Sequence, residues 1–379
     1  MTPCVRRAAL MLLILTLHLL PHDTARAADS PVPPDTQDET IEPLSPAEAL
    51  AALRLPEGFE ATLFAAEPDV RNPIAVSTDS RGRLWVAENF TYAERPTNFD
   101  LSLRDRILIL EDTDGDGVHD RHTVFWDEGQ KLTSIAVGFG GVWATCAPHL
   151  LFIPDRDGDD VPDGPPEIVL DGFDGDSVRH NIVNGLKWGP DGWLYGRHGI
   201  LATSRVGAPG AADAERTPIN CGVWRYHPTR KVFEAVAHGT TNPWGMDWDQ
   251  HGECWLINTV IGHLWHVVPG AHWERMYGSD FNPHLYGLLP QTANHVHWDE
   301  GERWSDIREG MSGTTDAAGG GHAHCGLLYC DASWPMEYRG SLLAGNLHGR
   351  RLNRDTLHRQ GSTYVARHAP DMLFSDDPY

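Results

Sequence analysis

The chain has 379 residues, of which 41% are hydrophobic and 22% are charged, a composition typical of a folded globular protein of one large or two medium domains. Acidic residues outnumber basic ones by 53 to 30, which gives a formal net charge of −23. A negative field of this size repels phosphate backbones, so it argues against a nucleic-acid partner and against binding to an anionic membrane surface. It is compatible with divalent cations.

Residues 1–27 have the pattern of an export signal. Arg6 and Arg7 precede an apolar run over residues 8–20, and Ala25 and Ala27 supply a small-residue cleavage site. The run is short for a membrane span, and a retained anchor is the alternative. We therefore expect an exported protein, periplasmic or secreted, with no membrane span in the mature chain. The five cysteines that remain are irregularly spaced and predict no disulfide framework.

A linker and a short helix are expected to precede the main domain. Residues 28–44 are rich in Pro, Asp, Glu and Thr and predict a flexible linker. Ser45 and Glu48 then form a capping box, with Pro46 at the first helical position. This pattern predicts a helix that ends near Leu53, at the start of a domain covering residues 45–379.

A repeated motif predicts the fold of this domain. Each copy has a glycine and, three residues later, an aromatic or apolar residue that begins a strand; the copies are Gly82–Trp85, Gly140–Trp143, Gly192–Tyr195, Gly252–Trp255 and a weaker Gly340–Leu343. Repeats of this length, with turn signals before most copies, are typical of a β-propeller with four-stranded blades. We predict an all-β, six-bladed-type propeller that is truncated after about five blades, because a sixth glycine would fall beyond the last residue.

The spacing between copies predicts a long insertion. Neighbouring glycines lie 58, 52, 60 and 88 residues apart, so the fourth blade is expected to carry about 30 extra residues. This insertion covers roughly residues 270–325 and contains several histidines. Long loops on a propeller usually lie on one face and carry function.

Two acidic loops predict structural calcium sites. The carboxylates of each loop occupy positions 1, 3, 5 and 9, and they are Asp112, Asp114, Asp116 and Asp120 in the first loop and Asp155, Asp157, Asp159 and Asp163 in the second. Hard oxygen ligands at this spacing suit Ca²⁺. Position 12 is Thr123 or Pro166 instead of the glutamate of an EF-hand, so we expect short loops between strands. The alternative is an acidic turn that never holds a metal.

Three segments predict a polar site near the propeller axis. In the first segment, His180 precedes a predicted inner strand, where a neutral imidazole can act as a general base. Asn184 lies at the start of that strand, and His198 is expected to bracket its other end. The alternative is that these histidines are structural.

The second and third segments would complete this site. Residues 241–244 contain an Asn-Pro pair, which predicts a turn that presents an amide to the axis. His322 and His324 follow three glycines and are expected on one face of a strand, where they would share a metal or form a hydrogen-bonded pair. The candidate stacking residues for a sugar are Trp193, Trp244 and Trp265. The candidate catalytic residue is His180, and the candidate cofactor-binding residues are Asn184, His198, Thr241, Asn242, Trp244, His322 and His324.

Several motifs resemble a known family over residues 45–379. They are LRLPEGFEATLFAAEPDVRNPIAVSTDSRGRLWVAE, LEDTDGDGVHDRHTVF, NGLKWGPDGWLYGRHG, NPWGMDW, GHLWHVVPGAHWERMYG, DFNPHLY, TDAAGGGHAHCG and YRGSLLAGNLHGRR. These motifs resemble the propeller of planctomycete-type membrane-bound dehydrogenases. More distantly, the blades are similar to those of sorbosone and soluble glucose dehydrogenases. That similarity implies a six-bladed propeller that binds pyrroloquinoline quinone (PQQ) and Ca²⁺ near its axis, with Thr241 at the place of an arginine that contacts the quinone.

The resemblance implies one function, and two alternative functions stay open. It implies oxidation of a sugar or related alcohol, with His180 as the base and a small-molecule substrate. The chain lacks the C-x-x-C-H haem motif of larger members, so the electron acceptor would be a separate cytochrome c. One alternative is a non-catalytic, Ca²⁺-stabilised propeller that binds carbohydrate or protein. Another is a metal-dependent, lactonase-like hydrolase.

Overall fold

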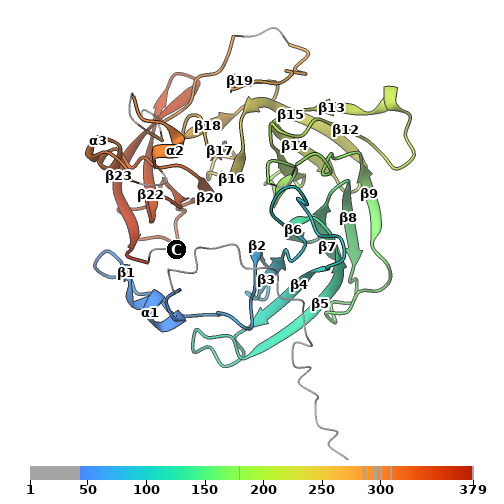
Figure 1. The fold of residues 1–379 in the computed structure, drawn as a ribbon, viewed down its shortest axis with the longest axis horizontal. Helices are drawn as coiled ribbons and strands as arrows, with labels where there is room; N and C mark the ends of the chain where they lie inside the picture. The colour runs from blue at the N-terminus through green and yellow to red at the C-terminus, as the bar shows by residue number, and fades with distance from the viewer. Residues whose placement is uncertain are drawn as a thin grey trace, which may run out of the picture. The chain divides into compact units, whose positions relative to one another are not determined.

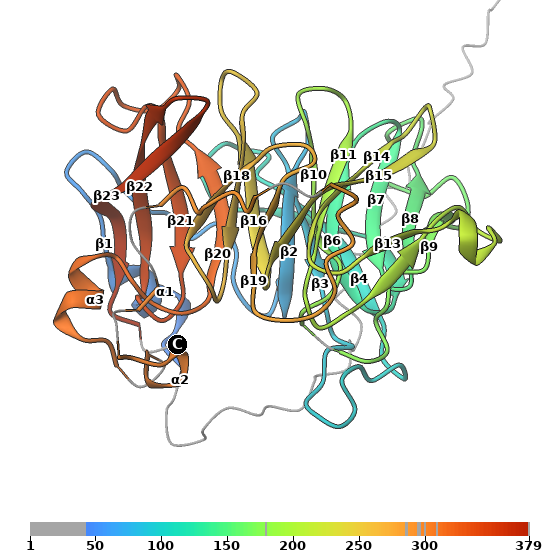
Figure 2. The ribbon, with the colours of Figure 1, turned by 90° about the horizontal axis from the view of Figure 1, so that it is seen from above.

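The computed structural model describes residues 43–178, 180–284, 287–293, 297–298, 301–307 and 310–377. The expected export signal and all but two residues of the expected linker lie outside these ranges, so both stay predictions. Strands dominate the described residues, and the fold is an all-β propeller (Figures 1 and 2). None of the described helices has the length and apolar character needed to cross a membrane.

Five antiparallel sheets follow one another along the chain. The first is β2 (Pro73–Thr78), β3 (Leu84–Glu88), β4 (Asp105–Glu111) and β5 (Arg121–Gly129). The second is β6 (Leu132–Val137), β7 (Gly141–Cys146), β8 (His149–Pro154) and β9 (Glu167–Asp171). The third contains β10 (Asn184–Trp188), β11 (Leu194–His198), β14 (Gly222–His227) and β15 (Val232–Thr240). The fourth is β16 (Pro243–Trp248), β17 (Cys254–Asn258) and β18 (Leu264–Val267). The fifth contains β20 (His324–Tyr329), β21 (Ser341–Asn346), β22 (Arg351–Gln360) and β23 (Thr363–Ser375).

The first strand of each sheet lies innermost. β2 contacts β6, β6 contacts β10, β10 contacts β16 and β16 contacts β20, so the inner strands form a continuous series around the axis (Figure 1). This arrangement confirms the predicted blades. The expectation that the repeat continues beyond them stays a prediction.

The repeated aromatic residue explains why the sheets pack together. Trp85, Trp143, Tyr195 and Trp255 are all buried on the second strands of their sheets. Each belongs to the hydrophobic cluster between its own sheet and the next one. An aromatic side chain buries about 150–250 Å², which corresponds to several kcal/mol as an upper estimate. The motif therefore marks the core between blades.

The fourth sheet differs from the expected four-stranded blade. In the described part of the chain it has three strands, and the chain leaves it after Val267, close to the start of the insertion expected over residues 270–325. Within the insertion, β19 (His272–Arg275) joins the third sheet as a parallel neighbour of β15. A Cβ at Gly239 would lie 2.4 Å from the Trp273 carbonyl oxygen, so glycine is needed for this close approach. The insertion also contains α2 (Trp304–Ile307) and α3 (Gly313–Ala317).

Short elements complete the fold. The predicted capping box is present at α1 (Pro46–Ala51), where the Ser45 side chain accepts a hydrogen bond from the Glu48 amide. β1 (Leu53–Arg54) then pairs with β23 and extends the fifth sheet. β12 (Ser204–Val206) and β13 (Thr217–Ile219) form a hairpin with a short 3₁₀ helix, Asp213–Glu215, between them.

Every inner strand has a register shift at the same end. The pairing of β2, β6, β10, β16 and β20 with the next strand is irregular within their first few residues. Such bulges bend a strand and redirect its side chains, and they are frequent next to active sites. The bulged end of the sheets is therefore where a site is expected.

Candidate functional site

A pocket of about 540 Å³ lies at the bulged end of the third, fourth and fifth sheets. Its walls come from the segments that precede β10, β16 and β20 and from those that follow β11, β17, β19 and β21. It is lined by His180, Asn181, Ile200, Leu201, Thr241, Asn242, Trp244, Thr259, Val260, Met276, Tyr277, His322, Ala323, Cys325 and Leu347. Its size suits a small organic molecule.

The structure brings most of the predicted site together in this pocket. The predicted residues in its lining are His180, Thr241, Asn242, Trp244 and His322. They lie up to 142 positions apart in sequence and come from three different blades. The predicted residues outside the lining are Asn184, His198 and His324.

Backbone hydrogen bonds tie the pocket walls to one another. Ile200 N donates to Thr241 O at 2.9 Å, which joins the third sheet to the fourth. Ala323 N donates to Thr259 O at 3.1 Å, which joins the fifth sheet to the fourth. The buried Asn258 side chain accepts hydrogen bonds from the amides of Thr241 and Asn242. The turn predicted at Asn242 is thus held rigidly.

Two side chains of the pocket wall are placed for recognition. Trp244 Nε1 donates to Asn242 Oδ1 at 2.9 Å, so the amide fixes the plane of the indole. Thr241 is 4% exposed, and its hydroxyl is buried without a hydrogen-bond partner among the described residues. A buried hydroxyl in a pocket wall costs free energy unless a ligand or water satisfies it.

His180 lies at the rim of the pocket. It is exposed, and its Nδ1 lies 3.1 Å from the hydroxyl of Tyr92, which follows β3 of the first sheet. The first sheet thereby contributes to a site built mainly by the third, fourth and fifth.

Asn184 and His198 are structural instead. Two antiparallel strands, β10 and β11, separate His180 from His198, where one strand was expected. His198 is fully buried, with Nδ1 2.8 Å from Gly199 O and Nε2 2.7 Å from Ser204 Oγ. Burial lowers its pKa to about 4, so it is neutral at pH 7. Asn184 is also buried, and its Oδ1 accepts from Arg197 Nε at 3.0 Å.

Arg197 is a candidate residue that the sequence analysis missed. It is 7% exposed, and no carboxylate pairs with it in the described part of the chain. Burial lowers its pKa to about 10, and the side chains of Cys254 and Cys325 lie near it. Cys325 lines the pocket, and Arg197 lies three residues from Ile200 along the chain. A buried cation without an anion is a ready partner for an anionic ligand group.

Gly185 is the sequence signal that points to Arg197. It faces Arg197 across the β10–β11 pair, and a Cβ built there would lie 1.5 Å from Arg197 Nη2. Its φ is +65°, in the left-handed region. Because Gly185 has no side chain, the Arg197 guanidinium can occupy the space beside it. A glycine opposite an arginine on paired strands is therefore a sequence signal for a buried guanidinium.

His322 and His324 do not share a face, contrary to expectation. Ala323, between them, has φ +63°, which breaks the alternation of a strand. His322 lies beside His348, whose Nδ1 is 2.7 Å from His322 O. His324 begins β20 and points instead toward His263 and His297. The expected metal pair is therefore wrong, because the backbone turns the two rings apart.

The acidic loops lie at the opposite end of the sheets. Both connect the third strand of a sheet to its fourth, and that connection is distal to the bulged end of the inner strand. One carboxylate oxygen from each of three aspartates lies within 4.8 Å of the others; the groups are Asp112, Asp114 and Asp116, and Asp155, Asp157 and Asp159. Asp120 and Asp163 instead accept backbone hydrogen bonds from Thr113 and Arg156. Three of the four predicted ligands therefore converge in each loop.

Other predicted features have structural roles. Trp193 stacks with Arg225, whose Cζ lies 4.2 Å from the ring centroid, and Trp265 is buried in the core between the third and fourth sheets. Trp244 is the one of the three proposed stacking residues that lines the pocket. The cysteines of the described chain are all free.

These observations define a β-propeller with a pocket of mixed polar and apolar lining at the bulged end of its inner strands. The model of the family described as "Domain of unknown function (DUF7133)" matches residues 45–379, and the chain belongs to this family. Comparison with curated proteins gives no match.

Solved structures share the fold at low sequence identity. The PQQ-bound aldose sugar dehydrogenase of Streptomyces coelicolor matches with a TM-score of 0.53 at 15% identity, over 84% of this chain and 85% of that one. The holo PQQ domain of pyranose dehydrogenase from Coprinopsis cinerea matches with a TM-score of 0.51 at 10% identity, over 86% and 87%. At such identity the likeness concerns the fold.

Proposed function

We propose that the pocket of about 540 Å³ binds PQQ and a sugar or related alcohol, which the protein oxidises. The observation that carries this proposal is the convergence of His180, Thr241, Asn242, Trp244 and His322 on one pocket of a fold shared with PQQ-bound sugar dehydrogenases.

For a planar, anionic cofactor the described pocket offers neutral donors in its lining and one buried cation, Arg197, outside it. The Thr241 hydroxyl lies unpartnered in the pocket wall, and the Asn242 side chain lies beside it. Arg197, near the lining residue Cys325, would be the partner of a carboxylate in place of the relatives' arginine, whose position Thr241 occupies in this chain. PQQ, when bound, supplies the two-electron acceptor for oxidation at a hydroxyl-bearing carbon.

His180 is the proposed general base. Base action at Nε2 requires the tautomer in which Nδ1–H donates to the Tyr92 oxygen, which leaves the Nε2 lone pair for the substrate hydroxyl proton. Tyr92 then orients the ring and stabilises the imidazolium that forms. Trp244 offers an indole face, fixed by Asn242, for stacking on a sugar ring.

We also propose that the two acidic loops hold structural Ca²⁺ ions, since three carboxylates converge in each. Because the two loops lie at the other end of the sheets from the pocket, we expect their ions to stabilise the fold. We expect Ca²⁺ to raise Tm in differential scanning calorimetry and Asp114→Asn together with Asp157→Asn to abolish that rise. An unchanged response to Ca²⁺ in the double variant would contradict this assignment.

Isothermal titration of PQQ into the Ca²⁺-loaded full chain tests the oxidoreductase proposal. We expect stoichiometric binding that Arg197→Met weakens, followed by reduction of an artificial acceptor with a panel of sugars. An external cytochrome c is the proposed physiological acceptor. Absence of PQQ binding in the Ca²⁺-loaded protein would overturn the proposal.

A non-catalytic carbohydrate-binding function is the second candidate. Among the described residues the lining contains neither lysine nor arginine, an arrangement that also suits an uncharged sugar. This function predicts sugar binding that is independent of PQQ, and the same calorimeter measures it.

A further inference from the structure

Three histidines meet between the fourth and fifth sheets, outside the pocket proposed for PQQ. They are His263, directly before β18, His297, in the insertion, and His324, at the start of β20. All three are buried. One ring nitrogen of each lies within 4.8 Å of the others, and the rings of His297 and His324 are 4.1 Å apart with planes at 15°.

An oxygen acceptor fixes the tautomer of each ring. His263 Nε2 lies 2.7 Å from Asp355 Oδ2, His297 Nδ1 lies 3.0 Å from Val260 O, and His324 Nε2 lies 2.9 Å from Asn353 Oδ1. Because a carboxylate or a carbonyl oxygen only accepts, each of these nitrogens carries the hydrogen in the neutral ring. The lone pairs then lie on His263 Nδ1, His297 Nε2 and His324 Nδ1, which are buried.

The supporting groups are themselves anchored. Asn353 Nδ2 donates to Asp371 Oδ1 at 3.1 Å, which fixes the orientation of the amide that faces His324. Asp371 also pairs with Arg351 and His368. Asp355 is 2% exposed on β22, where its backbone is paired on both sides. The acceptors cannot readily turn away.

We propose that His263, His297 and His324 form a site for a borderline transition metal, with Zn²⁺ as the expected ion. Metal-binding histidines characteristically donate their second N–H to a carboxylate or carbonyl oxygen, as all three do here. Nitrogen ligands favour Zn²⁺ over the Ca²⁺ expected in the acidic loops. Tetrahedral coordination at about 2.0–2.1 Å needs nitrogens about 3.3 Å apart, so the rings close slightly on binding.

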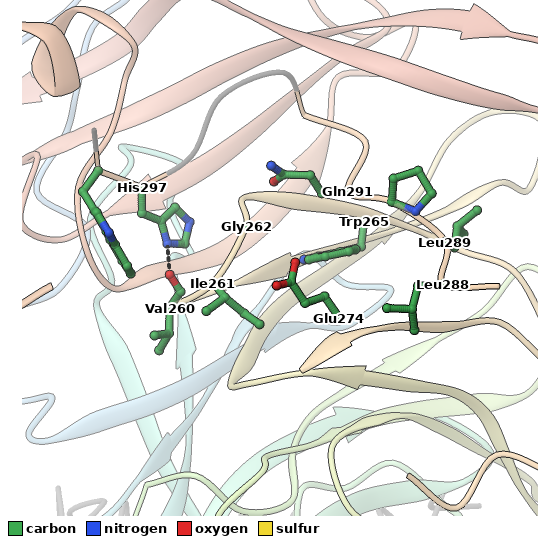
Figure 3. A pocket seen from close by; sticks show the side chains of 11 residues that line it. Val260, Ile261, Gly262, Trp265, Glu274, Leu288, Leu289, Gln291 and His297 are labelled. Atoms are coloured by element: carbon green, nitrogen blue, oxygen red, sulfur yellow. Dashed lines mark hydrogen bonds between the residues drawn. The ribbon is translucent and has the colours of Figure 1, made fainter. Parts of the chain in front are cut away.

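The ion would fasten the insertion to the blades. His297 belongs to the insertion, whereas His263 and His324 belong to the fourth and fifth sheets. His297 also lines a second pocket, of about 490 Å³, together with Val260. The hydrogen bond between His297 Nδ1 and Val260 O joins these two lining residues (Figure 3). The proposal does not depend on PQQ, so failure of PQQ binding would leave it standing.

Zn²⁺ titration of the chelator-treated full chain tests the site. Excess Ca²⁺ is present throughout, to fill the acidic loops. We expect one Zn²⁺ per chain by calorimetry, and with Co²⁺ the visible absorption of a four-coordinate ion. His297→Ala and His324→Ala should each abolish both signals, and Asp355→Asn should weaken binding about 10–100-fold.

Controls separate ligation from folding. His358→Ala removes an exposed histidine of β22 and should leave Zn²⁺ binding unchanged. In the wild-type chain, Zn²⁺ should slow trypsin cleavage at the exposed Arg303 of the insertion, a readout that needs no variant. Absence of stoichiometric Zn²⁺ binding to the wild-type chain, or unchanged binding in folded His297→Ala protein, would overturn the proposal.

Discussion

At the residue scale, His180 and Tyr92 act as a pair if the pocket performs an oxidation. His180→Gln should lower kcat by about 10²–10⁴-fold, because it removes the proton acceptor. Tyr92→Phe keeps the base and loses only its orientation, so it should lower kcat less than His180→Gln does. Steady-state kinetics with PQQ-loaded protein measures both effects. PQQ affinity serves as the control, since neither change should reduce it much.

His198 predicts a pH dependence of stability. Its folded-state pKa of about 4 lies below the unfolded value of 6.5, so its contribution is present above pH 6.5 and lost as the pH falls toward 4. His198→Gln should be less stable than the wild type at pH 7, and the difference should narrow by about 2 kcal/mol at pH 5. Urea unfolding at the two pH values measures this change. A difference that does not vary with pH would contradict the assignment of a buried, neutral ring.

At the element scale, the bulged start of β10 makes room for Arg197. Gly185→Ala would introduce a left-handed alanine and a Cβ 1.5 Å from the guanidinium. Gly192→Ala is a matched control, with φ +77° and open space around its Cβ. Gly192→Ala should lower the free energy of unfolding by about 1 kcal/mol because of backbone strain. Gly185→Ala should lower it several times more. Equal losses in chemical denaturation would show that Arg197 moves aside freely.

The sequence predicts elements better than it predicts side-chain neighbours. The glycine-aromatic motif marked the blades correctly because it reports a local strand and a buried ring. The direction of His324 depends on the left-handed backbone of Ala323, a residue with no preference for that conformation. Arg197 was missed because its burial without a carboxylate partner depends on the pairing of β10 with β11, which places Gly185 opposite it. Thr241, Asn242 and Trp244 all line the pocket, and an Asn-Pro pair fixes a turn through local geometry, which a sequence can report.

At the scale of the whole molecule, buried ion pairs join neighbouring blades. Arg83 is 6% exposed and lies between Asp79 of its own sheet and Asp160 of the second, with Nη1 2.6 Å from Asp160 Oδ2. The hydrogen bond from Arg83 lowers the pKa of Asp160. Asp160→Ala should lower the free energy of unfolding by about 3 kcal/mol, because the buried Arg83 charge keeps only Asp79 as a partner. A double-mutant cycle with Arg83→Met measures the coupling, and purely additive losses would rule it out.

The pairing of β1 with β23 has a consequence for folding in the cell. Arg54 binds Asp376 across 322 positions of sequence, so the contact has a very high sequence separation. During synthesis at about 5–20 residues per second, β1 leaves the ribosome tens of seconds before its partner. The fifth sheet therefore acquires its last strand only after the other blades have been made, and the entropy of closing so long a loop is lost in this final step. The earliest part of the domain to be synthesised is among the last to be fixed in place.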